Sequence, residues 1–309
     1  MKIRVPTSRQ LLAGGSVLAL LAIFWTLPLY ASIYAEILLG TIFMHVIMTT
    51  SWTIFSGPTG YISLASAAFF GVGIYVSAVL GKVLPLPLVI LVGAAAAFAL
   101  ALVIGALTLR LRGIYFCIFT FGLVELIKHV LLWWEINMMG TRGRFVVVVD
   151  QKTVYYAMLA VLVILLASAL LIRRSRFGLA LQSIGQQEEA AAHIGINVTW
   201  IKTLAFAISA CFMGAAGSIM ATRWTYIDPG IAFNPLFSFM PVLMAIFGGM
   251  GRIYGPLIGA AVFAYLEEIL ITRFPYHYML MFGAIMVLVI VFLPTGLVGL
   301  MQKWRKGGS

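Results

Sequence analysis

The sequence has little charge, and this narrows the class of protein. Only 9% of its 309 residues are charged, with 20 Lys and Arg against nine Asp and Glu. A soluble globular chain averages roughly 25% charged residues. Apolar residues make up 63% of the chain and the mean hydropathy is +1.09, more than a soluble core needs. The composition predicts a protein that lies largely within a lipid bilayer.

Cysteine and histidine are also scarce, which argues against the common metal and disulfide frameworks. Cys117 and Cys211 fall inside apolar runs, far apart and without CxxC spacing. The four histidines show no HExxH pattern or ligand pair at helical spacing; they are His45, His129, His193 and His277. We therefore expect no metal site, no disulfide and no cofactor.

Motifs for nucleotide hydrolysis and for nucleophilic catalysis are missing as well. The chain contains no Gly-x4-Gly-Lys-Ser/Thr and no Gly-x-Ser-x-Gly, so it is not expected to hydrolyse ATP or to be an enzyme. Its net charge of +11 is not gathered in a polar segment with interleaved aromatic residues. This distribution predicts no binding to nucleic acid.

Long apolar runs are what the sequence has instead. A spanning helix needs about 20 mostly apolar residues. Candidates are Leu11–Pro28, Ile33–Phe55, Tyr61–Leu80, Leu86–Leu109, Ile114–Trp134, Val154–Ile172, Thr203–Trp224, Pro235–Phe247, Ile253–Ile271 and Tyr278–Leu293. They predict an all-α polytopic membrane protein with about ten spans, or eight to ten. The first run is expected to be a retained anchor, because it lacks a convincing signal-peptide cleavage site.

Positive charge predicts the orientation, because cytoplasmic loops collect Lys and Arg. With the N-terminus inside and about ten crossings, most of the Lys and Arg residues lie on the cytoplasmic side. Both termini are then cytoplasmic, and so is the polar interval 173–202. We expect one transmembrane domain over residues 1–309, with this interval as a loop within it.

The loop 173–202 contains a stretch suited to short interfacial helices. Small and apolar residues from Phe177 to Ile194 alternate with polar ones, and Gly185 and Gly195 are expected to break the helices. Glu188 and Glu189 would stand at a helix start, where carboxylates are favourable. From the residues alone, such a helix could dock on a soluble partner or rest on lipid headgroups.

A family resemblance favours the docking interpretation. Glu189-Ala190-Ala191, three further residues and then Gly195 resemble the EAA loop of ABC importer permeases, which docks on an ATPase subunit. Further blocks resemble the branched-chain amino acid permease family and its LivM-type branch, in the same order and over about Ile33 to Leu300. These blocks are Gly60–Tyr75, Arg110–Phe116, Ser175–Gly178, Gly195–Val198, Leu204–Phe206 and Gly248–Pro256.

The resemblance implies a permease subunit of an ABC importer for branched-chain or related amino acids, in the bacterial inner membrane. It implies two cytoplasmic ABC ATPase subunits, a second homologous permease subunit and a periplasmic substrate-binding protein as partners. The coupling residues would be Glu188, Glu189, Ala190, Ala191 and Gly195. Substrate identity, and pairing with itself or with a sister chain, cannot be read from the sequence.

The segment Ser56–Gly60 is expected to interrupt a helix. Proline stops the preceding helix, and the glycines allow conformations closed to other residues. A half-helix starting here would turn its free N–H groups inward, as transporters do around anionic substrates. Gly57, Gly60, Ser63 and Ser66 are therefore candidate pathway residues. The alternative is a tight turn followed by small residues that serve close helix packing.

One apolar run carries three ionisable residues on one helical face. Glu125, Lys128 and His129 stand at i, i+3 and i+4. We expect a Glu125–Lys128 ion pair turned toward the protein interior, because charges at that depth need partners. Glu125 is also a candidate pathway residue. If the three groups relayed protons, the chain would instead be a proton-coupled secondary transporter or a channel.

Overall fold

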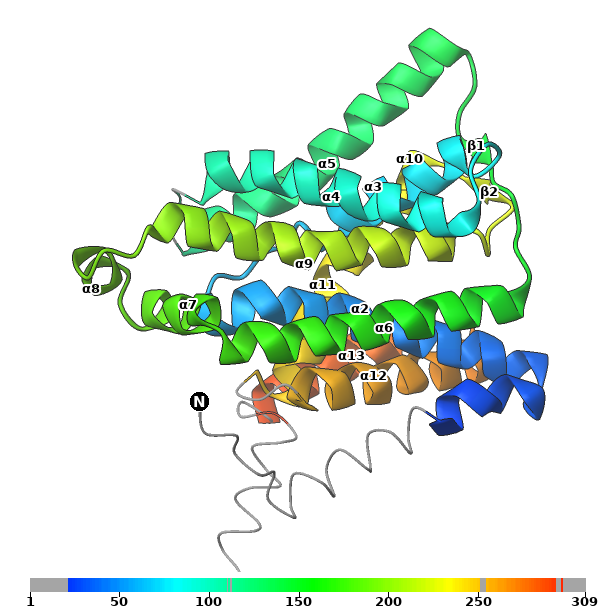
Figure 1. Cartoon of the computed structure of the whole chain (residues 1–309). Coiled ribbons are helices and arrows are strands. Elements are labelled where there is room, and N and C mark those ends of the chain that lie inside the picture. The colour runs from blue at the N-terminus through cyan, green and yellow to red at the C-terminus, as the bar shows by residue number, and fades with distance from the viewer. Residues whose placement is uncertain (1–21, 110, 112, 251–253, 293–295, 297–309) are drawn as a thin grey trace, which may run out of the picture.

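The computed structural model describes residues 22–109, 111, 113–250, 254–292 and 296. These residues form a bundle of helices, so the predicted all-α polytopic class is confirmed. The long helices run roughly along one direction (Figure 1). Helices α7 and α8 lie at one end of the bundle, and a two-stranded antiparallel sheet, β1–β2, lies at the other.

The helices follow each other along the chain with short connections. The longer ones are α2 (Ile33–Thr59), α3 (Ser66–Leu80), α4 (Leu86–Thr108), α5 (Ile114–Trp134), α6 (Gln151–Arg174), α9 (Val198–Ala221), α11 (Leu236–Gly248), α12 (Tyr254–Arg273) and α13 (Tyr278–Phe292). The shorter ones are η1 (Leu27–Leu29), the π-helical η2 (Glu135–Met139), α7 (Arg176–Gln186), α8 (Glu188–His193) and α10 (Pro229–Ala232). Strand β1 (Arg144–Phe145) pairs with β2 (Tyr226–Ile227).

Within the described residues, 7 helical stretches are long and apolar enough to cross a membrane. The expected number of about ten spans is therefore not confirmed. Most of the first expected span, Leu11–Pro28, lies outside the described residues. The run expected at Tyr61–Leu80 forms only the 15-residue helix α3. At 1.5 Å per residue α3 rises roughly 22 Å, which is short for a bilayer core.

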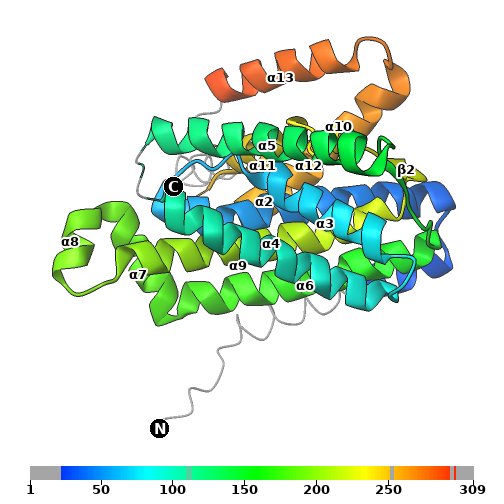
Figure 2. The same ribbon diagram turned by 90° about the horizontal axis from the view of Figure 1, so that it is seen from above.

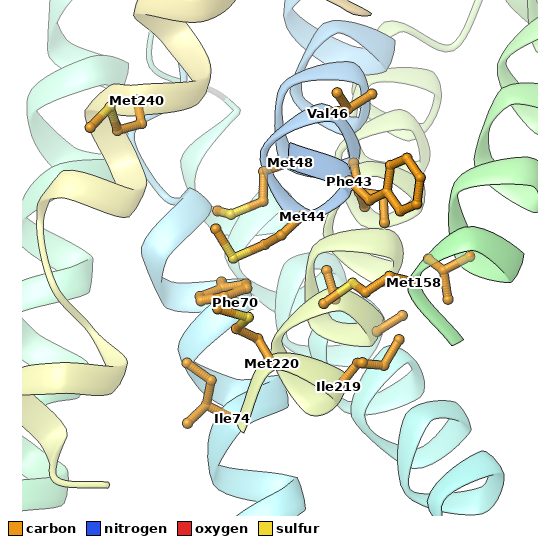
Figure 3. Close-up of a cluster of buried hydrophobic side chains, with 14 of the residues drawn as sticks. Phe43, Met44, Val46, Met48, Phe70, Ile74, Met158, Ile219, Met220 and Met240 are labelled. Carbon is orange, nitrogen blue, oxygen red and sulfur yellow. The ribbon is translucent and has the colours of Figure 1, made fainter. Parts of the chain in front are cut away.

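The core lies where α2 and α9 cross the other helices. In α9, 78% of the apolar window is buried, and in α2 67%. Buried side chains of α2, α3, α6, α9 and α11 meet in one cluster, which includes Met44, Phe70, Met158 and Ile219 (Figure 3). Seen from above, α13 lies along the edge of the bundle opposite α6 (Figure 2). Helices α2 and α9 therefore form the framework on which the other helices pack.

Glycines let α3 approach α9 at backbone distance. A Cβ on Gly73 would lie 2.0 Å from the carbonyl oxygen of Gly214, and a Cβ on Gly217 would lie 2.1 Å from that of Phe70. Small residues at such crossings bring two backbones into van der Waals contact, which stabilises helix pairs in membranes. This geometry supports the close-packing interpretation for the glycines of this segment.

The predicted break after Gly57–Gly60 is present, but proline does not cause it. Helix α2 continues through Pro58 to Thr59 and ends at Gly60, whose φ of 73° lies in the left-handed region. Pro58 lies inside the helix and lacks the N–H that would bond to the Ile54 carbonyl, but the helix continues past it. The chain is then extended until α3 begins at Ser66.

The expected helix break at Gly185 is wrong. Helix α7 continues to Gln186, and the extended residue Gln187 (φ −158°) separates it from α8. A Cβ on Gly185 would lie 1.8 Å from the carbonyl oxygen of Pro58. Gly185 therefore allows α7 to touch the end of α2. The expected break at Gly195 is confirmed, and its φ is 88°.

This contact predicts the effect of a single methyl group. Gly185→Ala should destabilise the protein by about 1–3 kcal/mol, because the methyl group must displace the backbone of α2. Gly57→Ala is the matched control, because its Cβ would meet only the Thr53 Cβ, at 3.8 Å. Thermal unfolding in detergent measures both. Equal melting temperatures for the two variants would contradict the contact.

Candidate functional site

A buried ammonium group lies at the α8 end of the bundle. Lys202, in the second turn of α9, has only 1% of its side chain exposed. Its Nζ donates to three oxygens: Glu188 Oε1 at 2.8 Å, the Leu109 carbonyl at 3.1 Å and the Tyr61 hydroxyl at 3.3 Å. A lysine ammonium has three N–H donors. Each donor therefore has an acceptor, as a buried charge requires.

The ring and the hydroxyl of Tyr61 both contribute to this site. The hydroxyl donates to Glu188 Oε2 at 2.8 Å, and Lys202 Nζ lies 4.5 Å from the ring centroid. The ring also packs edge-to-face on Phe116 at 5.5 Å. A cation over an aromatic face is attracted more strongly where water is excluded. Tyr61, Glu188 and Lys202, with the Leu109 carbonyl, are called the Lys202 node below.

The Lys202 node connects four separate parts of the chain. Glu188 begins α8, Tyr61 directly follows the break at Gly60, Leu109 caps α4, and Lys202 belongs to α9. The start of α9 is fixed by an N-cap, because the Asn197 side chain accepts a hydrogen bond from the Trp200 N–H. This cap positions Lys202 in the next turn. The node therefore links α8 to the segment between α2 and α3 through the Glu188–Tyr61 bond.

Of the five predicted coupling residues, two face the body of the protein and three are exposed. Glu188 bonds to the body of the protein, and Ala191 is 1% exposed. Glu189, Ala190 and Gly195 are exposed. The short helix α8 thus holds the body with one face and presents the other outward. This is the arrangement that a docking element requires.

The segment after Gly60 is buried from Ser63 onward, and backbone groups there and at the start of α3 bond to side chains of α2, α5 and α11. The bonds are Trp52 Nε1 to the Ser63 carbonyl (2.8 Å), the Leu64 N–H to Thr120 Oγ1 (3.0 Å) and the Ala67 N–H to Ser238 Oγ (3.2 Å). Irregular backbone at membrane depth needs such partners. The N–H groups expected to face a substrate are thus partly used within the chain.

The candidate pathway residues do not converge on one cavity. Gly57 lines a cavity of about 400 Å³ together with Thr50 and Arg173, and it is the only one of the five that does so. Ser63 Oγ accepts from the Ala65 N–H at 3.2 Å. The Ser66 hydroxyl is buried and has no hydrogen-bond partner among the described residues.

The remaining two candidates lie apart from these. Gly60 is exposed at the end of α2. Glu125 forms the expected ion pair with Lys128, and His129 Nε2 lies 3.7 Å from its Oε2. The pair is half-buried, with Lys128 19% and Glu125 31% exposed, so its expected orientation toward the interior stays a prediction. His129 is 69% exposed, because the described part of this chain does not cover that side of α5.

Sequence reasoning missed Tyr61 and Lys202 as site residues. Lys202 is expected at the edge of the polar loop, because the predicted span begins at Thr203. In the structure α9 begins at Val198, so Lys202 lies inside the helix. A signal was present, since Lys202 is a single cation between Ile201 and an apolar run. Nothing in the sequence identifies Tyr61 as its partner.

Comparison with known proteins identifies the family. Residues 34–290 match the family described as branched-chain amino acid transport system / permease component. The permease protein LivM of the high-affinity branched-chain amino acid transport system is 28% identical in Salmonella typhimurium and 26% identical in Escherichia coli. Each match covers 85% of this chain and 69% of the relative.

A second permease protein is similar over a shorter stretch. LivH of Escherichia coli is 29% identical over 44% of each chain. No solved structure matches the chain significantly. The family match covers most of the described helices, including α8 and the Lys202 node. The chain therefore belongs to the family of branched-chain amino acid transport permease components, and it is a multi-pass membrane protein.

Proposed function

We propose that the chain is the membrane-spanning permease subunit of an ABC importer that moves branched-chain or related amino acids across the inner membrane. Two cytoplasmic ABC ATPase subunits supply the energy, a second homologous permease completes the pathway, and a periplasmic binding protein delivers the substrate. Family membership and the named relatives support the substrate class. In this assignment the α8 end and both termini are cytoplasmic, and the β1–β2 end is periplasmic.

The Lys202 node is the observation that carries this proposal. An exposed helix that only rested on lipid would have no need for a buried, fully bonded contact with the interior. Here Glu188 of α8 is held by Lys202 and by the Tyr61 hydroxyl. A force applied to the exposed face of α8 is therefore transmitted to the interior without a flexible linker.

The mechanism follows the chain from α8 inward. When the ATPase subunits close, α8 moves with the surface on which it docks. Glu188 then displaces Tyr61, which is five residues before the start of α3 at Ser66. The extended segment between them can move more easily than a helix, because side-chain hydrogen bonds hold it in place of a continuous backbone ladder. The motion thus reaches the buried start of α3, where Ser63 and Ser66 lie.

The hydroxyl of Tyr61 allows a sharp test of this path. Tyr61→Phe removes the hydroxyl that donates to Glu188 and accepts from Lys202, and it leaves the ring and the Glu188–Lys202 pair in place. The amount of substrate taken up per ATP hydrolysed should fall on the order of threefold to tenfold, as for a lost bond of about 0.5–1.5 kcal/mol. The measurement is uptake and ATPase activity in proteoliposomes that contain the whole complex. Tyr254→Phe, an exposed tyrosine of α12, is the control. Equal ratios for the two variants would contradict the path.

Gly195 allows a test of the docking surface. Asparagine tolerates the left-handed region, so Gly195→Asn adds a side chain at φ 88° where the chain has no atom within 4 Å. ATPase stimulation by the permease should fall several-fold while the fold persists. Gly140→Asn is matched, because Gly140 has φ 67° and equally open surroundings at the opposite end. Unchanged stimulation in Gly195→Asn would count against docking through α8.

The energy source distinguishes the importer from the proton-coupled alternative. Uptake should persist when the proton gradient is collapsed and ATP is retained, because ATP hydrolysis supplies the energy. Glu125→Gln should then leave the pH dependence of uptake unchanged. If collapse of the proton gradient abolished uptake, the chain would instead be a proton-coupled transporter in which Glu125, Lys128 and His129 relay protons.

A further inference from the structure

Helix α5 is the spanning helix that the rest of the chain covers least. Over Ile114–Met139, 17% of the apolar window is buried, against 33% or more in the other spans found among the described residues. The buried residues of α5 are Phe116, Thr120 and Val124, none of them beyond its midpoint, and the next buried residue is Glu135 in η2. The second half diverges from the bundle (Figure 1). A large helical surface is thus left without a protein neighbour in the described chain.

The exposed residues of α5 follow a regular pattern. Six of them are separated alternately by four and three residues, and we call them the α5 stripe: Tyr115, Phe119, Gly122, Leu126, His129 and Trp133. Four further residues, Ile114, Ile118, Val130 and Trp134, are exposed beside this line. The exposed residues thus form one continuous face of the helix.

Charge on the same face indicates what covers the α5 stripe. His129 belongs to the stripe, and Glu125 and Lys128 border it near the middle of the 26-residue stretch Ile114–Met139. Ionisable groups at the bilayer centre are costly against lipid and occur where protein or a polar cavity meets them. A soluble partner reaches only the ends of the bundle. The covering partner must therefore itself span the membrane.

Gly122 shows how closely such a partner can approach. A Cβ on Gly122 would meet nothing within 4 Å, whereas those on Gly73 and Gly217 would meet the chain's own backbone. The chain's described helices thus make no use of the small size of Gly122. In membranes, a small residue on an interface lets the partner backbone come close.

We propose that the α5 stripe is the surface that pairs with a second permease chain of the same family. The inference rests on the proposed function, in which that chain is the partner that spans the membrane. Two α5 helices related by an axis along the membrane normal run parallel. Gly122 then faces the partner backbone, and the cluster of Glu125, Lys128 and His129 lies at the contact between the two chains.

A photo-crosslinker inserted at one position tests this surface in the intact complex. Leu126 is 59% exposed on the α5 stripe, and Ile164 is 58% exposed near the middle of α6. A photoreactive benzoyl-phenylalanine replaces either residue, and irradiated membranes are analysed by mass spectrometry. We expect permease peptides crosslinked at Leu126 and lipid adducts at Ile164. Lipid alone at Leu126, a peptide from another subunit at Leu126, or permease peptides at Ile164 would overturn the proposal.

A bulky residue at the contact gives a second, independent readout. With the crosslinker at Leu126, Gly122→Leu should reduce the permease crosslink on the order of tenfold, since about 1.4 kcal/mol of overpacking is enough for that change. Ala99→Leu on exposed α4 is the matched control. Equal crosslinking in both variants, with normal melting temperatures, would contradict close packing at Gly122.

The two proposals fail in different ways. If the permease chains pair through another face, the α5 crosslinks disappear while ATP-driven uptake remains. If the chain is not an importer subunit, uptake loses its dependence on ATP whatever the crosslinker at Leu126 captures.

Discussion

The structure depends on how one buried positive charge is satisfied. The ammonium of Lys202 lies almost completely out of water and donates to a carboxylate, a phenol and a backbone carbonyl. An uncompensated charge in such a place would be very costly. The three acceptors come from three separate parts of the chain, so the requirement to satisfy one side chain brings the α8 helix, the end of α4 and the break after α2 together. The proposed coupling path is a consequence of that requirement.

The break after α2 illustrates the same constraint in the backbone. Between Gly60 and Ser66 the chain leaves helical geometry inside the bundle, where the Ser63 carbonyl accepts from Trp52 and the Leu64 N–H donates to Thr120. Glycines allow the neighbouring helices to come close enough for such bonds, as Gly185 does for α7 against Pro58. Helix α5 is the exception to this dense packing. Its face with Gly122 and His129 is largely exposed in the described chain, and Glu125 and Lys128 beside it are only partly buried; the proposed pairing with a second permease would cover this face.

Several features could be predicted because they depend on local physics. Apolar runs of bilayer length predict helices, and α5 has the bounds expected for it, Ile114–Trp134. The i, i+3 spacing of Glu125 and Lys128 is enough to predict their ion pair. Two expectations about helix breaks were wrong, because the local preferences of Gly185 and Pro58 did not end their helices there. Gly185 does not break α7, since its role is close approach to α2, and Pro58 does not end α2, which continues to Thr59.

The sequence by itself determined the membrane class, most helix positions, the family and the segment that forms α8. These follow from composition, from the period of apolar residues and from motifs of neighbouring residues, all of which are local along the chain. Only the tertiary structure decided that Tyr61, Leu109, Glu188 and Lys202 meet, and that Glu125 and His129 are left partly uncovered. Such contacts join residues up to 141 positions apart. They depend on how whole helices pack, which no local pattern specifies.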